Sequence, residues 1–418
     1  MKLSIGFGHK PQEIEIDDSL IMGILEPNEI QLGLTGEEEV KRSLNNPIGT
    51  GRLRQIVKKG EKVVIVTSDI TRPLPSYKVI PSILDELYEV GVSPEDITVV
   101  FALGSHRPHT QEEIIQLVGE RVYKEVKCID SDANDSVSMG ITKGGTPVDV
   151  FRVVAEADRR ICIGNIEYHY FAGYSGGAKA IMPGVSTPAA IQANHRNMVL
   201  DDAKVGRLIG NPVRDDLNEA IQYCPIDFIV NVVLNEKKEI IFSVAGDYIK
   251  AHRVGCEFLD KIYKKQLQEK ADIAIVSQGG APKDINLYQT QKALANAEHA
   301  VKDGGIIILV GSCKEGFGSK IFEEWMTEAD SPDDIIARIR EKFVLGGHKA
   351  AAIALVQKKA KIFMVSEMDA DIVKSIFMEP YTSVQEAYND AIKELGQDVK
   401  VLVMPYGGST LPVVNNDL

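Results

Sequence analysis

The stretch that decides the fold is residues 62–103, KVVIVTSDITRPLPSYKVIPSILDELYEVGVSPEDITVVFAL. It opens with Lys62–Thr67, a mostly apolar run that is typical of a strand buried on both faces. Lys78–Glu89 follows with apolar residues at helical spacing, and Ile97–Leu103 is a second apolar run. A strand, a helix and a strand at this spacing predict a right-handed crossover and a parallel sheet with both faces covered.

The same alternation continues along the chain. In the first half it predicts strands at 161–164, 227–233 and 240–244 and helices at 110–118 and 248–270. The second half predicts strands at 272–276, 305–310, 362–365 and 399–404, and helices at 289–301, near Ile321, near Ile335 and at 384–395. The charged segment KKQLQEK, residues 264–270, indicates a solvated connector. We therefore expect two α/β domains with largely parallel sheets, residues 1–268 and 269–418, and an active-site cleft between them.

Composition limits the function classes. The 418 residues carry a formal net charge of −13, which argues against nucleic acid or an anionic membrane as a partner. We expect a cytoplasmic protein, because the chain has no long apolar span and begins without a basic, then apolar, secretory signal. The five cysteines lie far apart without a CxxC pair, so they predict small buried residues and neither a thiolate metal cage nor a disulfide framework.

Polar loops follow three of the expected strands: SDITRP at 68–73, GSHRPHT at 104–110 and GNIEYHYFAGYSGGAK at 164–179. Ligands of open parallel sheets bind beyond the carboxyl ends of the strands, so these loops are expected to converge on one pocket. Its side chains are predicted to be Asp69, Thr71, Arg72, His106, Arg107, His109, Glu167, His169 and Lys179.

The glycines match neither standard phosphate motif. Alanines flank Lys179 where a phosphate loop needs glycine before and Ser or Thr after, and GFGHKP at 6–11 lacks the third glycine of a dinucleotide fingerprint. Two interpretations stay open. Glycine amides together with Arg72 could bind an anion, or Gly173, Gly176, Gly177 and Gly184 could serve only tight turns.

The titratable groups admit several chemistries. His106 and His169 could stand on opposite sides of a small substrate, as a racemase requires, although lone histidines are often only hydrogen-bonded structural residues. His195 could bind a metal through a neutral imidazole, and Lys179 could be a desolvated nucleophile or a phosphate counter-ion. Tyr288 and Lys292 share one helical face, either as an exposed first turn or as a cationic contact for a substrate carboxylate.

Taken together, SDITRP, GSHRPHT, GNIEYHYFAGYSGGAKAIMPGVS, NHRNM and GGAPKDINLYQTQKAL closely resemble the nickel-dependent lactate racemase family over most of the chain. The resemblance implies a nickel pincer nucleotide joined covalently to Lys179, with His195 completing the nickel coordination. It implies that His106 and His169 are the catalytic acid and base, and that dedicated enzymes synthesise and load the cofactor. The resemblance also implies two sets of contacts. The residues expected to contact the cofactor are Asp69, Thr71, Arg72, Gly173, Ser175, Gly176 and Gly177. Those expected to contact the substrate are Arg72, Tyr288, Gln289 and Lys292.

The implied activity is interconversion of D- and L-2-hydroxy acids by reversible hydride transfer to the cofactor. One departure concerns the substrate: GGHKAAAIALV at 346–356 has alanines where the family carries a tryptophan, and the sole tryptophan is Trp325. A 2-hydroxy acid somewhat larger than lactate is therefore open. The alternatives are an epimerase of sugar acids or other 2-hydroxy acids on the same cofactor, a hydrolase using His169 with Glu167, and a carboxylate-binding homologue without catalysis.

Overall fold

The computed structural model describes residues 1–414 and forms two compact units. One unit is continuous, residues 30–261, and the other combines residues 1–29 with the chain from residue 262 onward. The predicted boundary near residue 268 lies close to the second junction, but residues 1–29 differ from the prediction, because they belong with the C-terminal unit. The reason is strand pairing: β3 (Ile21–Ile24) pairs in parallel with β19 (Val401–Met404).

The continuous unit is built on a six-stranded sheet in the order β13-β12-β9-β4-β5-β6. Every neighbouring pair is parallel except β12 with β13. The strands are β4 (Val63–Ser68), β5 (Ile97–Ala102), β6 (Lys127–Asp130), β9 (Arg159–Asn165), β12 (Phe228–Leu234) and β13 (Ile240–Gly246). This sheet confirms the predicted α/β class and the strands expected at 62–67, 97–103, 161–164, 227–233 and 240–244.

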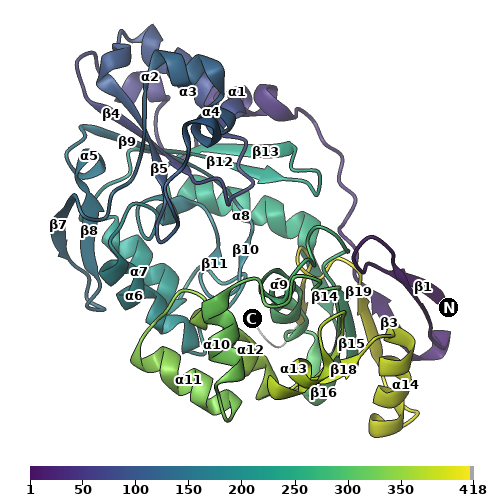
Figure 1. Ribbon diagram of the computed structural model, residues 1–418. Coiled ribbons are helices and arrows are strands. Elements are labelled where there is room, and N and C mark those ends of the chain that lie inside the picture. Colours follow the sequence, from purple (N-terminus) through teal and green to yellow (C-terminus); the bar gives the residue numbers. More distant parts are fainter. Residues whose placement is uncertain (415–418) are drawn as a thin grey trace. The chain divides into compact units, whose positions relative to one another are not determined.

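Four helices cover one face of this sheet, as Figure 1 shows. They are α1 (Gly36–Asn45), α2 (Leu53–Ile56), α3 (Ser76–Glu89) and α4 (Gln111–Glu125). The fully buried Ile80 and Ile83 of α3 pack in one hydrophobic core with Ile65 and Val99 of the sheet. Helix α4 begins after Thr110, whose hydroxyl accepts from the Glu113 N–H while the Glu113 carboxylate accepts from the Thr110 N–H.

The opposite face carries the segments that matter for function. They are the hairpins β7 (Ser136–Ile141) with β8 (Pro147–Phe151) and β10 (Tyr168–His169) with β11 (Gly173–Tyr174), the short helices α5 (Arg152–Ala155), η3 (Gly177–Ala180) and η4 (Arg196–Val199), and the longer α6 (Pro188–His195), α7 (Pro212–Ala220) and α8 (Lys250–Tyr263). From β4 the chain goes to β5 on one side and later returns to β9 on the other. The strand order therefore reverses between β4 and β9, which is where open α/β sheets bind ligands.

The second unit has its own six-stranded sheet, entirely parallel, in the order β18-β17-β16-β15-β19-β3. The strands not yet given are β15 (Ala271–Ser277), β16 (Val301–Val310), β17 (Lys361–Val365) and β18 (Glu379–Tyr381), beside the hairpin β1 (Lys2–Ile5) with β2 (Gln12–Glu15). Its helices are α9 (Leu287–Ala297), α10 (Lys320–Thr327), α11 (Pro332–Glu341), α12 (Gly347–Gln357), α13 (Ala370–Ser375) and α14 (Val384–Leu395). Ile5, Ile14 and Ile16 are buried in the same core as Ile273 and Ile308.

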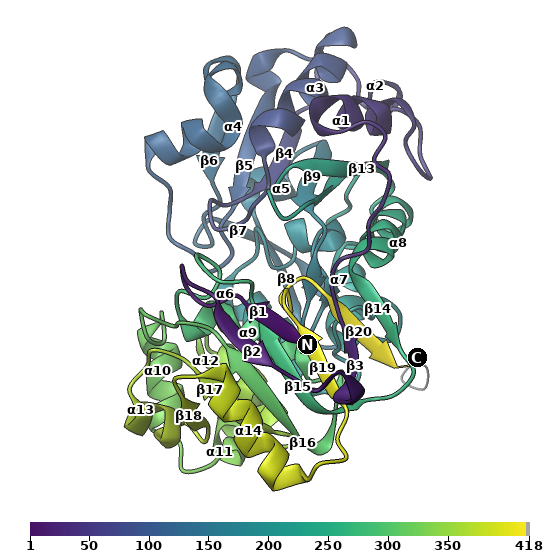
Figure 2. The same ribbon diagram turned by 90° about the vertical axis from the view of Figure 1, so that its right-hand side faces the viewer.

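One predicted element is wrong. The helix expected over 248–270 ends at Tyr263, and the supposed connector contains β14 (Lys264–Leu267), which pairs in parallel with β20 (Leu411–Val414). Figure 2 shows these two strands side by side. Four charged side chains in the segment 264–270 hid the strand, because the partner that stabilises it lies far away in sequence.

The cysteines are small and mostly buried residues, as expected. All five cysteines of the chain lie in the described part and are free thiols, and every one except the half-buried Cys128 is buried. No helix within residues 1–414 is long and apolar enough to span a membrane.

Candidate active site

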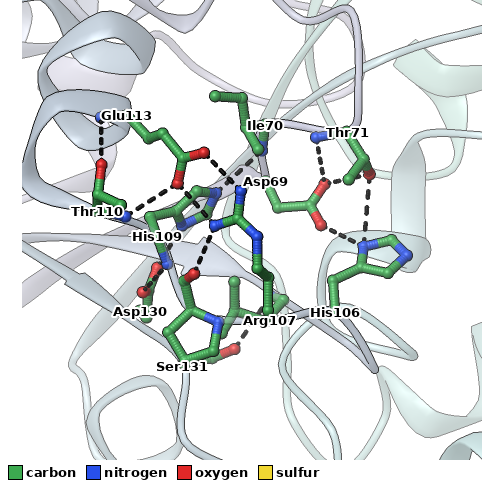
Figure 3. Close-up of polar contacts among 12 residues, drawn as sticks. Asp69, Ile70, Thr71, His106, Arg107, His109, Thr110, Glu113, Asp130 and Ser131 are labelled. Atoms are coloured by element: carbon green, nitrogen blue, oxygen red, sulfur yellow. Dashed lines mark hydrogen bonds and ion pairs between the residues drawn. The ribbon is translucent and has the colours of Figure 1, made fainter.

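Loops after β4, β5 and β9 supply the predicted polar side chains at the switch point. Asp69 and Thr71 follow β4, His106 follows β5, and His169 and Lys179 follow β9. Three of these groups, from two loops, are in direct contact: Asp69, Thr71 and His106, as Figure 3 shows. The positive charge of Arg72 lowers the pKa of Asp69, His169 and Lys179. The first and third loops are therefore close enough to interact electrostatically.

The Asp69 carboxylate orients His106. One oxygen of the buried Asp69 is bonded to His106 Nδ1, and the other accepts from Thr71 Oγ1 at 2.7 Å and the Thr71 N–H at 3.2 Å. Burial raises the pKa of Asp69, but the hydrogen bonds from His106 and Thr71 outweigh it, so that pKa lies below its ordinary value. An ionised carboxylate at Nδ1 holds the proton there and leaves the Nε2 lone pair as a base. The His106 side chain is 30% exposed, so it can meet a ligand.

A second histidine–carboxylate pair, His109 with Asp130, has a different role. His109 Nδ1 lies 2.6 Å from Asp130 Oδ1, and Nε2 accepts from the Ile70 N–H at 3.0 Å. The His109 side chain is 1% exposed. This histidine therefore joins the β5 loop to the β4 loop, and Figure 3 shows the dashed line from its ring to the Ile70 backbone nitrogen. Arg107, also expected in the pocket, is instead paired with Glu113 at 2.6 and 2.8 Å.

His169 and Lys179 form the centre of the third loop. His169 Nδ1 accepts from the Ala172 N–H at 3.3 Å, and its Nε2 lies 3.3 Å from Lys179 Nζ. Burial lowers the pKa of Lys179 far below its ordinary value, with the charges of Arg214 and Arg72 adding to the effect. Burial and the charge of Lys179 likewise lower the pKa of His169. The lowered pKa keeps His169 neutral near pH 7 and favours the neutral form of Lys179, and a neutral amine is a nucleophile.

Phe171 is the hub that brings His195 into this group. Its ring contacts the His169 ring edge-on at 4.5 Å and the His195 ring at 5.0 Å, and Lys179 Nζ lies 5.8 Å from its centroid. The structure thus gathers His169, Lys179 and His195 around one buried aromatic ring. Sequence reasoning quoted Phe171 within its motif but assigned it no role, although three neighbouring aromatics, Tyr168, Tyr170 and Phe171, were a signal.

The glycines serve the protein's own packing. Gly173, Gly176 and Gly177 have φ of 77°, 74° and 59°, a region that favours glycine. A Cβ on Gly173 would meet the Arg207 carbonyl oxygen at 2.2 Å, and one on Gly176 would meet Asn231 Oδ1 at 2.7 Å. Close approach of the backbone to protein atoms therefore explains these glycines, as in the tight-turn interpretation.

Ser175 is engaged within the same loop. Its hydroxyl donates to the Asn165 carbonyl at 2.7 Å and accepts from the Glu167 N–H at 2.9 Å. These two hydrogen bonds hold residues 165–167, where the loop begins, against the turn that contains Gly173 and Gly176.

Two residues that the sequence analysis missed brace this loop. Arg214 of α7 is buried, and its guanidinium donates to the carbonyls of Ala172 at 3.1 Å and of Tyr174. Burial lowers the pKa of Arg214 to about 10. His252 of α8 donates from Nε2 to the Ser175 carbonyl at 2.7 Å, and burial lowers its pKa to about 3. Nothing in the sequence marks either residue, since each is one of several polar residues in an amphipathic helix.

The remaining predicted residues lie on the first turns of α9 in the other unit. Tyr288 and Lys292 are one turn apart on this helix, as expected; Tyr288 is half-buried and Lys292 is exposed. The Tyr288 ring contacts Phe322 edge-on at 5.8 Å, and Lys349 Nζ lies 5.0 Å from its centroid. The backbone carbonyl of Gln289 accepts a hydrogen bond from Gln278 Nε2 at 2.8 Å.

Sequence comparisons agree with these motifs. The family models for the lactate racemase N-terminal domain and C-terminal domain match residues 7–206 and 266–412. A lactate racemase of Thermoanaerobacterium thermosaccharolyticum is 34% identical over 421 residues, covering 98% of each chain. One of Lactiplantibacillus plantarum is 35% identical over 384 residues, covering 90% of each.

Structural comparison extends the likeness. The lactate racemase apoprotein from Thermoanaerobacterium thermosaccharolyticum superposes with a TM-score of 0.90 at 33% identity, covering 99% of this chain and 100% of that one. A Thermotoga maritima protein of 19% identity, with a TM-score of 0.66 over 92% of this chain and 100% of that one, shares the fold alone. Two domain matches and alignments over nearly the whole length confirm the resemblance found in the motifs, and the chain belongs to the lactate racemase family.

Proposed function

We propose that this protein is an isomerase that interconverts the D and L forms of lactate or a somewhat larger 2-hydroxy acid. The observation that carries the proposal is the group of His169, Lys179 and His195 around Phe171, together with the Asp69–His106 pair at the switch point. Family membership supports the reaction class.

A nickel pincer nucleotide fits the chemistry of these side chains. The lowered pKa of Lys179 favours its neutral amine, the form that attachment to a thiocarboxyl arm would require. His195 is an imidazole that can supply one nickel ligand. No cluster of three or more His, Cys, Asp or Glu side chains in residues 1–414 could hold a metal by itself, so the cofactor would have to bring most of the nickel's ligands. When bound, it supplies a carbon that accepts hydride from the substrate's α-carbon and returns it to either face.

The chain's own residues handle the proton. His106 Nε2 has a free lone pair because Asp69 accepts the proton on Nδ1, and it takes the hydroxyl proton of one enantiomer as the α-carbon loses hydride. His169, half-buried and neutral because of its lowered pKa, performs the same step for the other enantiomer. Phe171 and the buried loop keep water from the planar 2-keto acid.

We assign binding of the substrate carboxylate to two cationic side chains, Arg72 and Lys292. Arg72 is exposed at the switch point, and its guanidinium can bind a carboxylate in two-pronged fashion. Lys292, Tyr288 and Gln289 are the contacts that we propose from the second unit.

Substrate size is the open part of the proposal. Ala350, Ala351, Ala352 and Ala354 of α12 are buried, and a Cβ on Gly347 would meet the Trp325 ring at 2.6 Å. The alanines therefore pack inside their unit, and the one tryptophan of the chain lies against the GGHKA turn.

The test is production in a host that makes the cofactor, with a host lacking that pathway as control. We expect close to one nickel per chain, a mass increment on the peptide containing Lys179, and racemisation of single enantiomers of several 2-hydroxy acids by chiral chromatography. A Lys179→Ala variant should lose the mass increment. Absence of nickel and increment from a host with a working pathway would refute the proposal. Epimerisation of sugar acids, or carboxylate binding without turnover, would favour the alternatives.

A further inference from the structure

A chain of buried hydrogen bonds ends on His195. Its Nδ1 lies 2.9 Å from Oδ1 of Asn194, the preceding residue of α6. The Asn194 side chain is fully buried, and its Nδ2 donates to Asp216 Oδ2 at 2.7 Å and to the Val213 carbonyl at 3.1 Å. Both partners of Nδ2 are acceptors only, so they fix which end of the amide carries nitrogen. The oxygen end must then face His195.

Asp216 on α7 is itself fixed. It is 7% exposed and accepts from the hydroxyls of Thr142 and Thr146, on the turn between β7 and β8, with Thr146 Oγ1 at 2.7 Å. An ionised carboxylate can only accept hydrogen bonds, so both threonine hydroxyls and Asn194 Nδ2 must donate to it. The direction of donation therefore runs from the two threonines and Asn194 toward Asp216.

The consequence for His195 is a single tautomer. Because Asn194 Oδ1 can only accept, His195 Nδ1 must carry the proton, and the lone pair of the neutral ring lies on Nε2. A histidine ligand needs this lone pair, and hydrogen bonds behind metal ligands are known to set ring orientation and tautomer.

We propose that Asn194 and Asp216 are positioning residues, which hold His195 as the Nδ1–H tautomer and aim Nε2 at nickel. The role at nickel rests on the proposed function; the tautomer itself does not. Asn194 stands in the motif NHRNM without an assigned role, and no motif contains Asp216, which lies more than twenty positions from His195 on another helix.

The experiment measures the tautomer by NMR in unloaded, full-length protein labelled with 15N-histidine, with the His195 signals assigned by His195→Gln. In the wild type we expect a protonated Nδ1 and an unprotonated Nε2. Asn194→Ala should lose this preference. The matched control is Asn296→Ala, which removes a buried amide that donates to the Gly407 carbonyl at 2.7 Å in the other unit and should leave His195 unchanged.

A second readout is nickel retained after loading and extensive dialysis. Loss of a residue behind a metal ligand commonly weakens metal binding by about 10–100-fold, so Asn194→Ala should retain much less nickel than the wild type and Asn296→Ala should retain as much. A wild-type His195 with its proton on Nε2 overturns the proposal whether or not any variant folds, as does an unchanged tautomer in a folded Asn194→Ala. The predicted tautomer in a chain that never takes up nickel would instead count against the proposed function.

Discussion

At the scale of single residues, the lowered pKa of Lys179 destabilises the unloaded protein. Its pKa is lowered by burial, so between that pKa and the ordinary value of 10.5 the unfolded chain binds a proton that the folded chain does not. This difference favours unfolding at pH 7 and disappears above about 10.5. Lys179→Met should therefore raise the Tm of the unloaded chain at pH 7, by roughly 2–4 °C for each kcal/mol regained.

The pH dependence separates this effect from simple packing. The gain in Tm should shrink as the pH approaches 10.5, whereas a packing effect would persist at every pH. Lys204→Met, at an exposed lysine, is the control and should leave Tm unchanged. A Lys179→Met variant that is less stable than wild type at pH 7 would contradict the assignment of a neutral, desolvated amine.

The two histidine–carboxylate pairs allow a matched comparison. Asp69→Asn removes the carboxylate that holds the proton on His106 Nδ1 and leaves Nε2 free to act as a base, so we expect kcat/KM of the loaded enzyme to fall about 10²–10⁴-fold. Asp130→Asn weakens the buried His109 contact and should cost about 1–3 kcal/mol in a urea titration while the folded fraction keeps its turnover. Equal losses of turnover in the two folded variants would contradict the separate roles.

Asp69 also has a stability signature. Its pKa is below the ordinary value of 3.8, so ionised Asp69 stabilises the fold above about pH 4, and this contribution is lost as the pH falls through the lowered pKa. The stability difference between wild type and Asp69→Asn, followed by urea titration, should therefore narrow on acidification.

At the scale of elements, the loop that carries His169 and Lys179 depends on α7. The buried guanidinium of Arg214 donates hydrogen bonds to two carbonyls of this loop. A lysine ammonium lacks the forked geometry of a guanidinium and can replace only part of these hydrogen bonds. Arg214→Lys should cost about 2–4 kcal/mol and speed hydrogen exchange in residues 172–178. Arg207→Lys, at an exposed arginine paired with Asp202, is the control and should change stability by less than about 0.5 kcal/mol. Unchanged exchange in Arg214→Lys would show that the loop holds its shape alone.

The same elements show what sequence could predict. Strands such as β4 and β5 carry long apolar runs and helices such as α3 carry a 3.6-residue period, so their positions follow from local pattern. The convergence of Asp69, Thr71 and His106 followed from loop position at the carboxyl edge. Arg214, His252 and the Asn194–Asp216 contact depend on which helix packs behind which loop, and no local pattern encodes that. Strand β14 was missed for the same reason, since its partner β20 is distant in sequence.

At the scale of the whole molecule, the division of the chain predicts which pieces fold alone. Residues 30–261 hold a complete six-stranded sheet and core, so this fragment should unfold cooperatively. A fragment that begins at residue 262 lacks β3, an edge strand of its sheet, and lacks Ile5, Ile14 and Ile16 of its core. Burying each of these three isoleucines contributes roughly 1.5–3 kcal/mol, comparable to the whole stability of a small domain.

We therefore expect the fragment from residue 262 onward to lack a cooperative thermal transition, and restoring residues 1–29 to rescue it. The backbone suggests how to join them: the Asn28 N–H donates to the Ile262 carbonyl at 2.7 Å, so a short glycine–serine linker can connect residue 29 to residue 262. Circular dichroism melts of the two fragments and the fusion provide the measurement, and a fusion carrying Ile14→Asp and Ile16→Asp is the control. A cooperative transition in the fragment without residues 1–29, equal to that of the fusion, would mean that the unit folds without the N-terminal segment and that this segment is not an essential part of its core.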